Sequence, residues 1–444
     1  MKIIQGEEFY SYWKSAAKKA EDTKTDKVVK KIIADVRAKG DAAVRKYASK
    51  FDKSSPQWFE VPPVEAQSAL EQLRASEPAL TGALELAAGH IRRFAEAQKA
   101  QFAHFEYEME TGLVTGQRVI PVIPVQRAAV YIPGGRFPLF SSVLMGMIPA
   151  FCAGVEEVIL SSPPTQDGLP DRKILAAAAI AANVSGANYL NLRPFAMGGA
   201  QAIAALALGT ESVPRVDVIA GPGNKYVAAA KRLLFGEVGI DFIAGPTDVL
   251  VIADGSSPNA AKLAAADMIG QAEHDPDART RALVPSRELA EQIAVAIEQR
   301  LVALPTAATA RASLEAGGLI IIYRSTGEAM DIANTIAPEH LELQVAGADT
   351  WIRHLKNYGS LFIGALSAEA LGDYSAGINH TLPTSTSARF TGGLSVRHFL
   401  KTVTTLRCDP GEGFEKARNA AEIIARAEGL EGHAESAAVR RHIK

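Results

Sequence analysis

Residues 128–135 read AAVYIPGG, a short apolar strand that stops at a Gly-Gly turn. Beyond it the pattern alternates, and we expect a helix from Ser141, a strand at 156–162, a helix at 174–183, a strand at 216–223 and a helix from near Tyr226. Strands that alternate with helices of this length predict parallel, right-handed crossover units.

The same alternation resumes after Gly245. We expect strands at 248–254, 281–286, 317–323 and 360–364, and helices at 256–274, 287–303 and 327–337. The apolar periodicity of residues 1–100 predicts helices, and the pattern of 411–444 predicts a charged, alanine-rich helix pair. The predicted fold class is α/β: two Rossmann-like (incomplete, doubly wound) domains with a helical N-terminal segment and a small C-terminal helical tail.

Composition narrows the class of protein. The chain has 444 residues and a net charge of -2, so no global field attracts nucleic acid or an anionic membrane. The most apolar long stretch, 143–160, contains Pro149 and two glutamates and does not predict a membrane span. Two cysteines, Cys152 and Cys408, make no disulfide framework and indicate a reducing compartment. We therefore expect a cytoplasmic protein with neither nucleic-acid nor membrane partners.

Two glycine turns end predicted strands, at Pro133-Gly134-Gly135 and at Gly221-Pro222-Gly223-Asn224. A glycine turn before a helix lets backbone N–H groups approach a phosphate, but any tight turn between strand and helix also needs glycine. Neither turn matches G-x-G-x-x-G, so the usual dinucleotide fingerprint is absent.

Several polar groups could carry chemistry, and each also has a plain structural interpretation. Gln271 and His274 share one helix face. They could bind a metal, or they could simply be polar residues at a helix end. Glu339-His340 could divide base chemistry or be a surface loop dipeptide. Asp373 and His380 share a glycine-rich loop, and His433 is alone in the C-terminal helices. The spacing of these residues alone predicts an α/β, nucleotide-linked enzyme, but it does not identify a substrate.

Taken together, the chain resembles the histidinol dehydrogenase family from about residue 25 to about 440. The matching stretches are YIPGG at 131–135, GGAQAIAALALGTESVPRVD at 198–217, GPGNKYVAAAKR at 221–232, GQAEHDPDA at 270–278, APEHLEL at 337–343, GSLFIGALSAEALGDYSAGINHTLPT at 359–384 and AEGLEGHA at 427–434.

The resemblance implies a set of site residues. One zinc ion per subunit would be held by Gln271, His274, Asp373 and His433, the last from the neighbouring subunit, so the implied unit is a homodimer with a shared active site. Tyr131, Gln201 and Asn224 would contact NAD. Positions matching the family's substrate contacts are Thr247, Gln271, His274, His340, Glu369, Asp373, His380, Glu428 and His433.

The implied reaction takes a primary alcohol through an aldehyde to a carboxylate. His340 would take the alcohol proton, Glu339 would activate water for attack on the aldehyde, and two NAD would be consumed per substrate. The zinc would position the substrate. The substrate implied is L-histidinol, in the last two steps of histidine biosynthesis.

The resemblance also implies a division of the chain. Residues 1–25 are the N-terminal helical segment, and 26–130 join 248–380 in a discontinuous domain on the metal and substrate side. Residues 131–247 form the dinucleotide side, and 381–444 form an intersubunit arm.

Some positions depart from the family. Thr247 and Asp248 replace a serine and a glutamate, Arg136 replaces a small residue, and 192–195 look like an insertion. Residues 388–394 and 401–404 look closer to relatives that oxidise other alcohols, so oxidation of 2,3-dihydroxypropane-1-sulfonate to sulfolactate stays an alternative. A silent nucleotide-binding regulator and a dehydrogenase without zinc are the other hypotheses.

Overall fold

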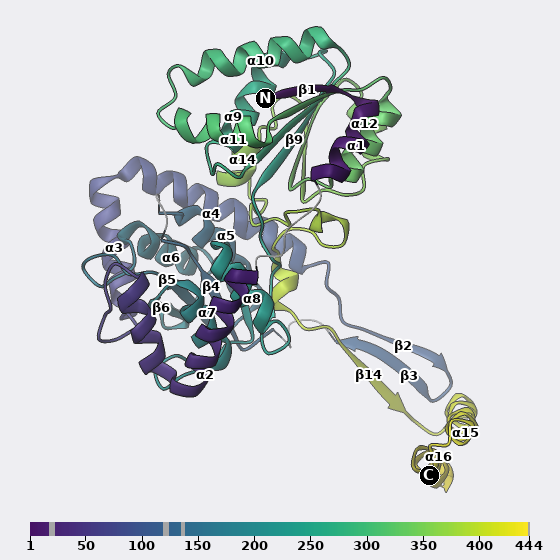
Figure 1. The fold of residues 1–444 in the computed structure, drawn as a ribbon. Helices are drawn as coiled ribbons and strands as arrows, with labels where there is room; N and C mark the ends of the chain where they lie inside the picture. Colours follow the sequence, from purple (N-terminus) through teal and green to yellow (C-terminus); the bar gives the residue numbers. More distant parts are fainter. Residues whose placement is uncertain (17–22, 119–123, 135–137, 443–444) are drawn as a thin grey trace.

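The computed structural model describes residues 1–16, 23–118, 124–134 and 138–442. Two parallel sheets form two lobes, and an arm projects away from both (Figure 1). Arg136, singled out in the sequence, lies outside the described residues. Among the described residues, no helix is long and apolar enough to cross a membrane.

The lower lobe contains a five-stranded parallel sheet in the order β6-β5-β4-β7-β8. Its strands are β4 (Arg127–Tyr131), β5 (Glu157–Ser162), β6 (Leu192–Ala196), β7 (Val218–Ala220) and β8 (Gly239–Ile240). The helices between them are α5 (Phe140–Ala153), α6 (Arg172–Val184), α7 (Gly199–Leu208) and α8 (Lys225–Leu234). The chain runs from β4 to one edge and then returns to β7, so a topological switch lies between β4 and β7.

The N-terminal helices complete this lobe. They are α2 (Thr23–Phe51), α3 (Pro63–Ser76) and α4 (Pro78–Lys99). The apolar stripe of α2 packs with α7 and α8 on one face, whereas α3 and α4 pack with α5 and α6 on the other. The sequence predicts that 26–130 join the 248–380 domain. In the structure the helices of this segment instead cover the 127–240 sheet, because their apolar faces meet its alanine-rich helices.

The upper lobe contains a six-stranded parallel sheet in the order β1-β11-β10-β9-β12-β13. Its strands are β1 (Lys2–Gln5), β9 (Asp248–Ala253), β10 (Arg279–Val284), β11 (Leu319–Ile322), β12 (His340–Gln344) and β13 (Ser360–Ile363). One face carries α9 (Ala260–Ala272), α10 (Arg287–Leu301) and α11 (Ala307–Gly317). The other carries α1 (Gly6–Ala16), α12 (Thr326–Ile336) and α13 (Ala348–Ile352). The N-terminal segment therefore contributes an edge strand as well as the expected helix.

The arm is built from two distant parts of the chain (Figure 1). An antiparallel sheet joins β2 (Phe105–Glu110), β3 (Leu113–Arg118) and β14 (Val403–Cys408), and beyond it lie α15 (Glu412–Ala427) and α16 (Glu431–Ala438). The predicted C-terminal helix pair is thus present.

The stretch interpreted as an insertion at 192–195 is strand β6. Arg193 pairs there with Glu60 and Glu157, and its guanidinium lies over the ring of Phe195. Pro194 lacks a donor but is tolerated because β6 is the edge strand of its sheet.

Candidate active site

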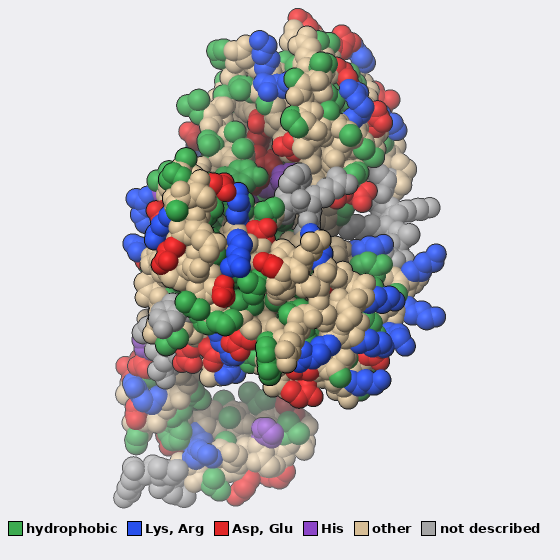
Figure 2. Space-filling model, turned by 90° about the vertical axis from the view of Figure 1, so that its left-hand side faces the viewer, with side chains coloured by type: hydrophobic (Ala, Val, Ile, Leu, Met, Phe, Trp, Pro, Cys, Tyr) green, Lys and Arg blue, Asp and Glu red, His purple; other side chains and the backbone are tan. Residues whose placement is uncertain are grey.

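A cavity of about 190 Å³ lies between the two lobes. The lower lobe contributes the start of α5 and the turn after β7, and the upper lobe contributes α9, β12 and α14 (Glu369–Tyr374). The hollow between the lobes shows acidic and histidine side chains (Figure 2). Seven predicted site residues line the cavity: Thr247, Gln271, His274, Glu339, His340, Asp373 and His380.

The two sheets present opposite edges to this cavity. The turn after β7 follows the carboxyl end of its strand, where open α/β sheets place ligands. In the upper sheet, however, Asp248 and His340 are the first residues of β9 and β12, so the cavity lies at the amino ends of those strands. The site therefore lies between the carboxyl ends of the strands in the lower sheet and the amino ends of the strands in the upper sheet.

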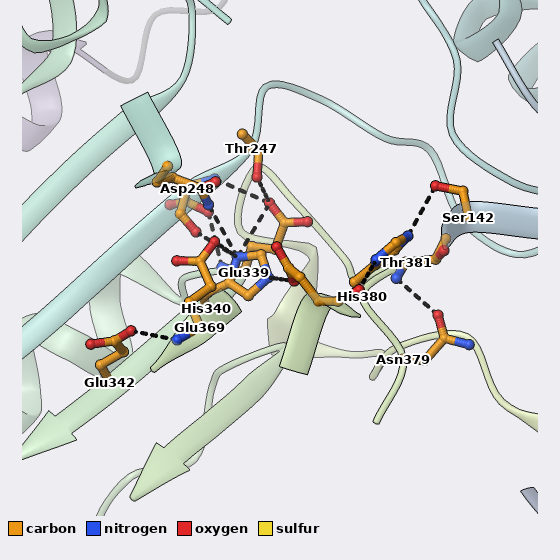
Figure 3. A network of polar contacts seen from close by, with 12 residues as sticks. Ser142, Thr247, Asp248, Glu339, His340, Glu342, Glu369, Asn379, His380 and Thr381 are labelled. Carbon is orange, nitrogen blue, oxygen red and sulfur yellow. Dashed lines mark hydrogen bonds and ion pairs between the residues drawn. The ribbon is translucent and has the colours of Figure 1, made fainter. Parts of the chain in front are cut away.

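Glu339 is buried and held in one orientation (Figure 3). Its Oε2 accepts hydrogen bonds from Thr247 Oγ1 at 2.5 Å and from the Asp248 N–H at 3.1 Å. Burial raises the pKa of Glu339 to about 7, although neighbouring His340 and the Thr247 hydrogen bond oppose the increase. The hydroxyl of Thr247, which stands where the family has a serine, thus donates a hydrogen bond to Glu339. A carboxylate with a pKa near neutrality can take a proton from water.

Asp248 fixes the backbone beside Glu339. Its Oδ1 accepts the Glu339 N–H at 2.9 Å, and its Oδ2 accepts Arg281 Nη1 at 2.9 Å. Both Asp248 and Arg281 are buried, so the ion pair is shielded from solvent. The sequence analysis noted Asp248 only as a departure and did not identify Arg281, because their pairing joins neighbouring strands.

His340 lies at the centre of three carboxylates. Its Nδ1 is 3.6 Å from Glu369 Oε1 and 3.9 Å from Glu339 Oε2, and its Nε2 is 3.5 Å from Asp373 Oδ1. Burial lowers the pKa of His340, but the charges of Glu369, Glu339 and Asp373 outweigh it and raise the pKa well above its ordinary value. The amide of Gln271 lies 3.1 Å from Nδ1. Neutral His340 is therefore a strong proton acceptor.

The donor atoms here fit a divalent metal. Ligand atoms of His340, Glu369 and Asp373 lie within 4.8 Å of one another. His340 Nε2 and Glu369 Oε2 are buried and have no hydrogen-bond partner among the described residues. Burial raises the pKa of Asp373, but the nearby imidazoles, first that of His340 with Nε2 3.5 Å from Oδ1, outweigh it and hold the pKa below its usual value. Imidazole nitrogen with carboxylate and amide oxygen suits zinc.

His380 connects the two lobes. Its Nδ1 lies 2.8 Å from the Asp373 carbonyl oxygen, and its Nε2 lies 3.0 Å from Ser142 Oγ in α5 (Figure 3). Burial lowers the pKa of His380, so the ring is neutral and donates from Nδ1 to the carbonyl. Ser142 was missed by the sequence analysis, because a serine in an apolar helix carries no signal of its own.

Glu369 is buried behind the cavity rather than exposed in it. Its backbone N–H donates to Glu342 Oε1 at 2.9 Å, and burial, with the charges of neighbouring acids, raises the pKa of Glu369 to about 8. Glu342 is a further buried carboxylate that the sequence analysis did not identify.

The candidate dinucleotide residues lie outside the cavity lining, around the switch point of the lower sheet. Tyr131 ends β4, and its buried phenol oxygen accepts the Gly199 N–H at 3.0 Å. Gln201 is buried in the first turn of α7, and Asn224 caps α8 because its Oδ1 accepts the Tyr226 and Val227 N–H groups. Gly221 has φ +110°, and a Cβ there would overlap the Tyr131 carbonyl oxygen, so the turn requires glycine.

Glu428 and His433 are the two predicted residues that the single chain places in the arm, away from the cavity. Glu428 follows α15 and His433 lies in α16, both at the far end of the arm.

Known proteins resemble this chain over nearly its whole length. A family model described as histidinol dehydrogenase matches residues 15–441. The chain is 44% identical over 421 residues to the histidinol dehydrogenase of Thermus thermophilus, with 95% of each chain covered. It is 42% identical over 426 residues to that of Burkholderia pseudomallei, with 95% of this chain and 92% of the relative covered. A crystal structure of histidinol dehydrogenase from Elizabethkingia anophelis has a TM-score of 0.87 at 33% identity, over 97% of this chain and 95% of that one.

Proposed function

The chain belongs to the histidinol dehydrogenase family, and we propose that it oxidises L-histidinol through the aldehyde to L-histidine with NAD as the hydride acceptor. Membership makes it an oxidoreductase that acts on an alcohol. The observation that carries the proposal is the placement of Glu339 and His340 in one cavity with the turn after β7, where a dinucleotide would lie.

His340 takes the alcohol proton in the first step. Three carboxylates within 4 Å raise its proton affinity, and they stabilise the imidazolium once it forms. Its position at the start of β12 and the packing of Phe362 near its ring keep the imidazole in place.

Glu339 activates water in the second step. Its pKa of about 7 leaves a substantial carboxylate fraction at neutral pH, and that carboxylate has high proton affinity. Thr247 and the Asp248 N–H both bind Oε2, so Oε1 is the oxygen that can accept the proton of water. Water attack on the aldehyde then gives the hydrate that the second hydride transfer oxidises.

Zinc would be held by Gln271, His274 and Asp373 with His433 of the partner subunit, and would supply a cationic anchor for the substrate's amine and imidazole. The first three residues line the cavity, and unpartnered Nε2 of His340 faces the same space. Glu369 would act from behind the cavity through its contact with His340, and the partner's Glu428 would add negative charge beside the substrate's amine.

The proposed active unit is a homodimer. In one chain the arm carries exposed apolar side chains at Phe105, Tyr107, Met109, Leu406, Ile423, Ile424 and Leu430. A second copy that covers them would remove this surface from water and bring His433 to a cavity that its own chain leaves incomplete.

The sulfonate alternative is not favoured. The relatives reported above are histidinol dehydrogenases, and a sulfonate would meet the carboxylates of Glu339 and Asp373 in the cavity lining. The test measures NAD reduction by the zinc-loaded protein with L-histidinol and with 2,3-dihydroxypropane-1-sulfonate, and identifies the products by chromatography. We expect histidinol to have at least a hundredfold larger kcat/KM; preference for the sulfonate would overturn the proposal.

A further inference from the structure

Four buried polar atoms without a hydrogen-bond partner among the described residues belong to segments at the carboxyl edge of the lower sheet. They are Asp52 Oδ2, Ser54 Oγ, Ser162 Oγ and Gln201 Nε2, here called the Asp52 cluster. Buried polar atoms in native proteins are normally paired, so such a group indicates a ligand or ordered water. The reaction described above uses none of these four except Gln201.

The cluster is assembled from three segments. Asp52 directly follows α2, and its N–H bonds to the Ala48 carbonyl, which fixes it at the helix end. Ser162 ends β5, and Gln201 lies in the first turn of α7. A Cβ on Gly198 would come within 3.2 Å of Asp52 Oδ1, so the carboxylate lies directly against the turn that starts α7.

The surroundings of Asp52 contain no cation to neutralise it among the groups that shift its pKa. Burial raises the pKa of Asp52 to about 6, while the Gln201 side chain and the Gly198 N–H oppose the increase. Tyr131 is the titratable group beside it: burial and the charge of Asp52 raise the pKa of its phenol, whose oxygen accepts the Gly199 N–H. A carboxylate kept here at an electrostatic cost is typical of a binding group rather than of a stabilising ion pair.

The cluster lies where one half of a dinucleotide would extend. The nicotinamide half must reach the cavity beside Pro222 and Ser142, and the glycine turn after β7 can receive the diphosphate. From there, the carboxyl ends of β4, β5 and β6 lead away from the cavity to Tyr131 and Asp52. A dinucleotide that spans the switch point with its nicotinamide in the cavity would place its adenosine half on this side of the sheet.

We propose that Asp52 accepts the hydroxyl groups of the adenosine ribose and thereby makes the protein selective for NAD over NADP. The proposal rests on the proposed function insofar as that names a nicotinamide dinucleotide. An ionised carboxylate binds a ribose diol but repels a 2′-phosphate, the arrangement by which acidic residues select NAD in other dinucleotide folds. Gln201 Nε2 supplies the adjacent donor.

The test compares binding of NAD and NADP to the wild-type protein and to Asp52→Asn by calorimetry, without an alcohol substrate. We expect wild type to bind NAD at least tenfold more tightly than NADP. In D52N, NAD binding weakens about tenfold because a charged hydrogen bond is lost, while NADP binding is unchanged or stronger. The NADP-to-NAD affinity ratio therefore rises at least tenfold.

Two results would overturn the proposal: a wild-type protein that binds NADP as tightly as NAD, or a D52N variant whose ratio stays within twofold of wild type. A purely structural role for Asp52 would weaken both cofactors equally and leave the ratio unchanged. The matched control is Asp35→Asn in α2, the helix that ends just before Asp52, where Asp35 bonds Tyr47 and Lys46; its ratio should not move.

Binding also separates this proposal from the proposed function. A protein that binds NAD selectively through Asp52 but oxidises no histidinol would contradict the proposed function alone. The wild-type comparison needs no variant, so the test stands even if D52N does not fold.

Discussion

The carboxyl groups around His340 have different pKa values because their surroundings differ. Burial raises the pKa of Glu339 to about 7 and that of Glu369 to about 8, whereas three nearby imidazoles hold Asp373 below its usual value. Carboxylates whose environments separate their pKa values can take different roles in one site. Asp373 is ionised and suited to a metal, while Glu339 is the group able to exchange a proton near neutral pH.

Replacing Glu339 by Gln should therefore impair the second step more than the first. The amide keeps the Thr247 and Asp248 contacts within reach but cannot take a proton from water. We expect NADH formation from histidinal to fall by about 10²–10⁴, the usual worth of a general base. Single-turnover rates with histidinol and with histidinal measure the two steps separately, and equal losses in both would contradict this assignment.

Asp52 predicts a pH dependence of cofactor binding. Its pKa is raised from 3.8 to about 6, so the carboxylate that accepts the ribose hydroxyls is lost as the pH falls through that value. The Kd for NAD should accordingly decrease as the pH rises from 5 to 7, and D52N should lack this step. Titrations at a series of pH values check the prediction; the same pH profile in both proteins would refute it.

At the residue scale, the sequence reached the site mainly through resemblance. Gln271, His274, Glu339, His340, Asp373 and His380 line one cavity, as expected of positions that share a site. Ser142, Arg281 and Asp52 were not found, because each acts through a contact with a segment far away in the sequence. Their residue types are common and form no local motif.

At the element scale, a buried ion pair fixes the turn after β7. Lys231 in α8 donates to the Gly221 carbonyl at 2.9 Å and pairs with Asp241, and Asp241 in turn accepts the Gly221 and Phe242 N–H groups. Both side chains are almost fully buried. The pair therefore connects the proposed diphosphate turn to Phe242 in the cavity wall.

Lys231→Met should destabilise the lower lobe strongly. It leaves Asp241 as an uncompensated buried charge, which costs about 3–5 kcal/mol and corresponds to a decrease in Tm of about 10 °C. Differential scanning calorimetry measures the change. Arg37→Ala is the matched control, because the Arg37–Glu237 pair is exposed and contributes less than about 1 kcal/mol. Equal effects of the two substitutions would contradict the role given to the buried pair.

Strand alternation explains why the sequence did not predict β12. In β12, Leu341 and Leu343 face one hydrophobic core, while His340, Glu342 and Gln344 are polar yet equally buried. Such alternation ordinarily indicates a strand with one wet face, and here the polar face meets the site. The strands with continuous apolar runs, such as β5 and β9, were correctly predicted.

At the scale of the whole molecule, the arm carries the residue that the proposed site takes from a second chain. His433 lies at its end, away from the cavity of the same chain. Sequence periodicity predicted the helices of this arm and of residues 23–99, but it could not place them. Which sheet an amphipathic helix covers depends on the shape of the opposing face, and α2, α3 and α4 match the lower lobe.

A shared site predicts complementation between two inactive variants. H433A lacks an arm residue, and E339A lacks a group in the cavity, so each homodimer should be inactive. In a mixed dimer, one intact cavity meets one intact arm. Coexpression should therefore restore about a quarter of the wild-type activity, since half of the dimers are mixed and half of their sites are complete. No recovery from a verified mixed dimer would show that each chain completes its own site.

The central claim is that one site carries an alcohol through an aldehyde to an acid. The most direct test loads the purified protein with zinc, adds limiting L-histidinol and excess NAD, and counts the NADH formed at completion. The account predicts two NADH per histidinol, with L-histidine as the product. One NADH with release of the aldehyde would contradict the two-step site, and no NADH from a dimeric, metal-loaded protein would contradict the substrate itself.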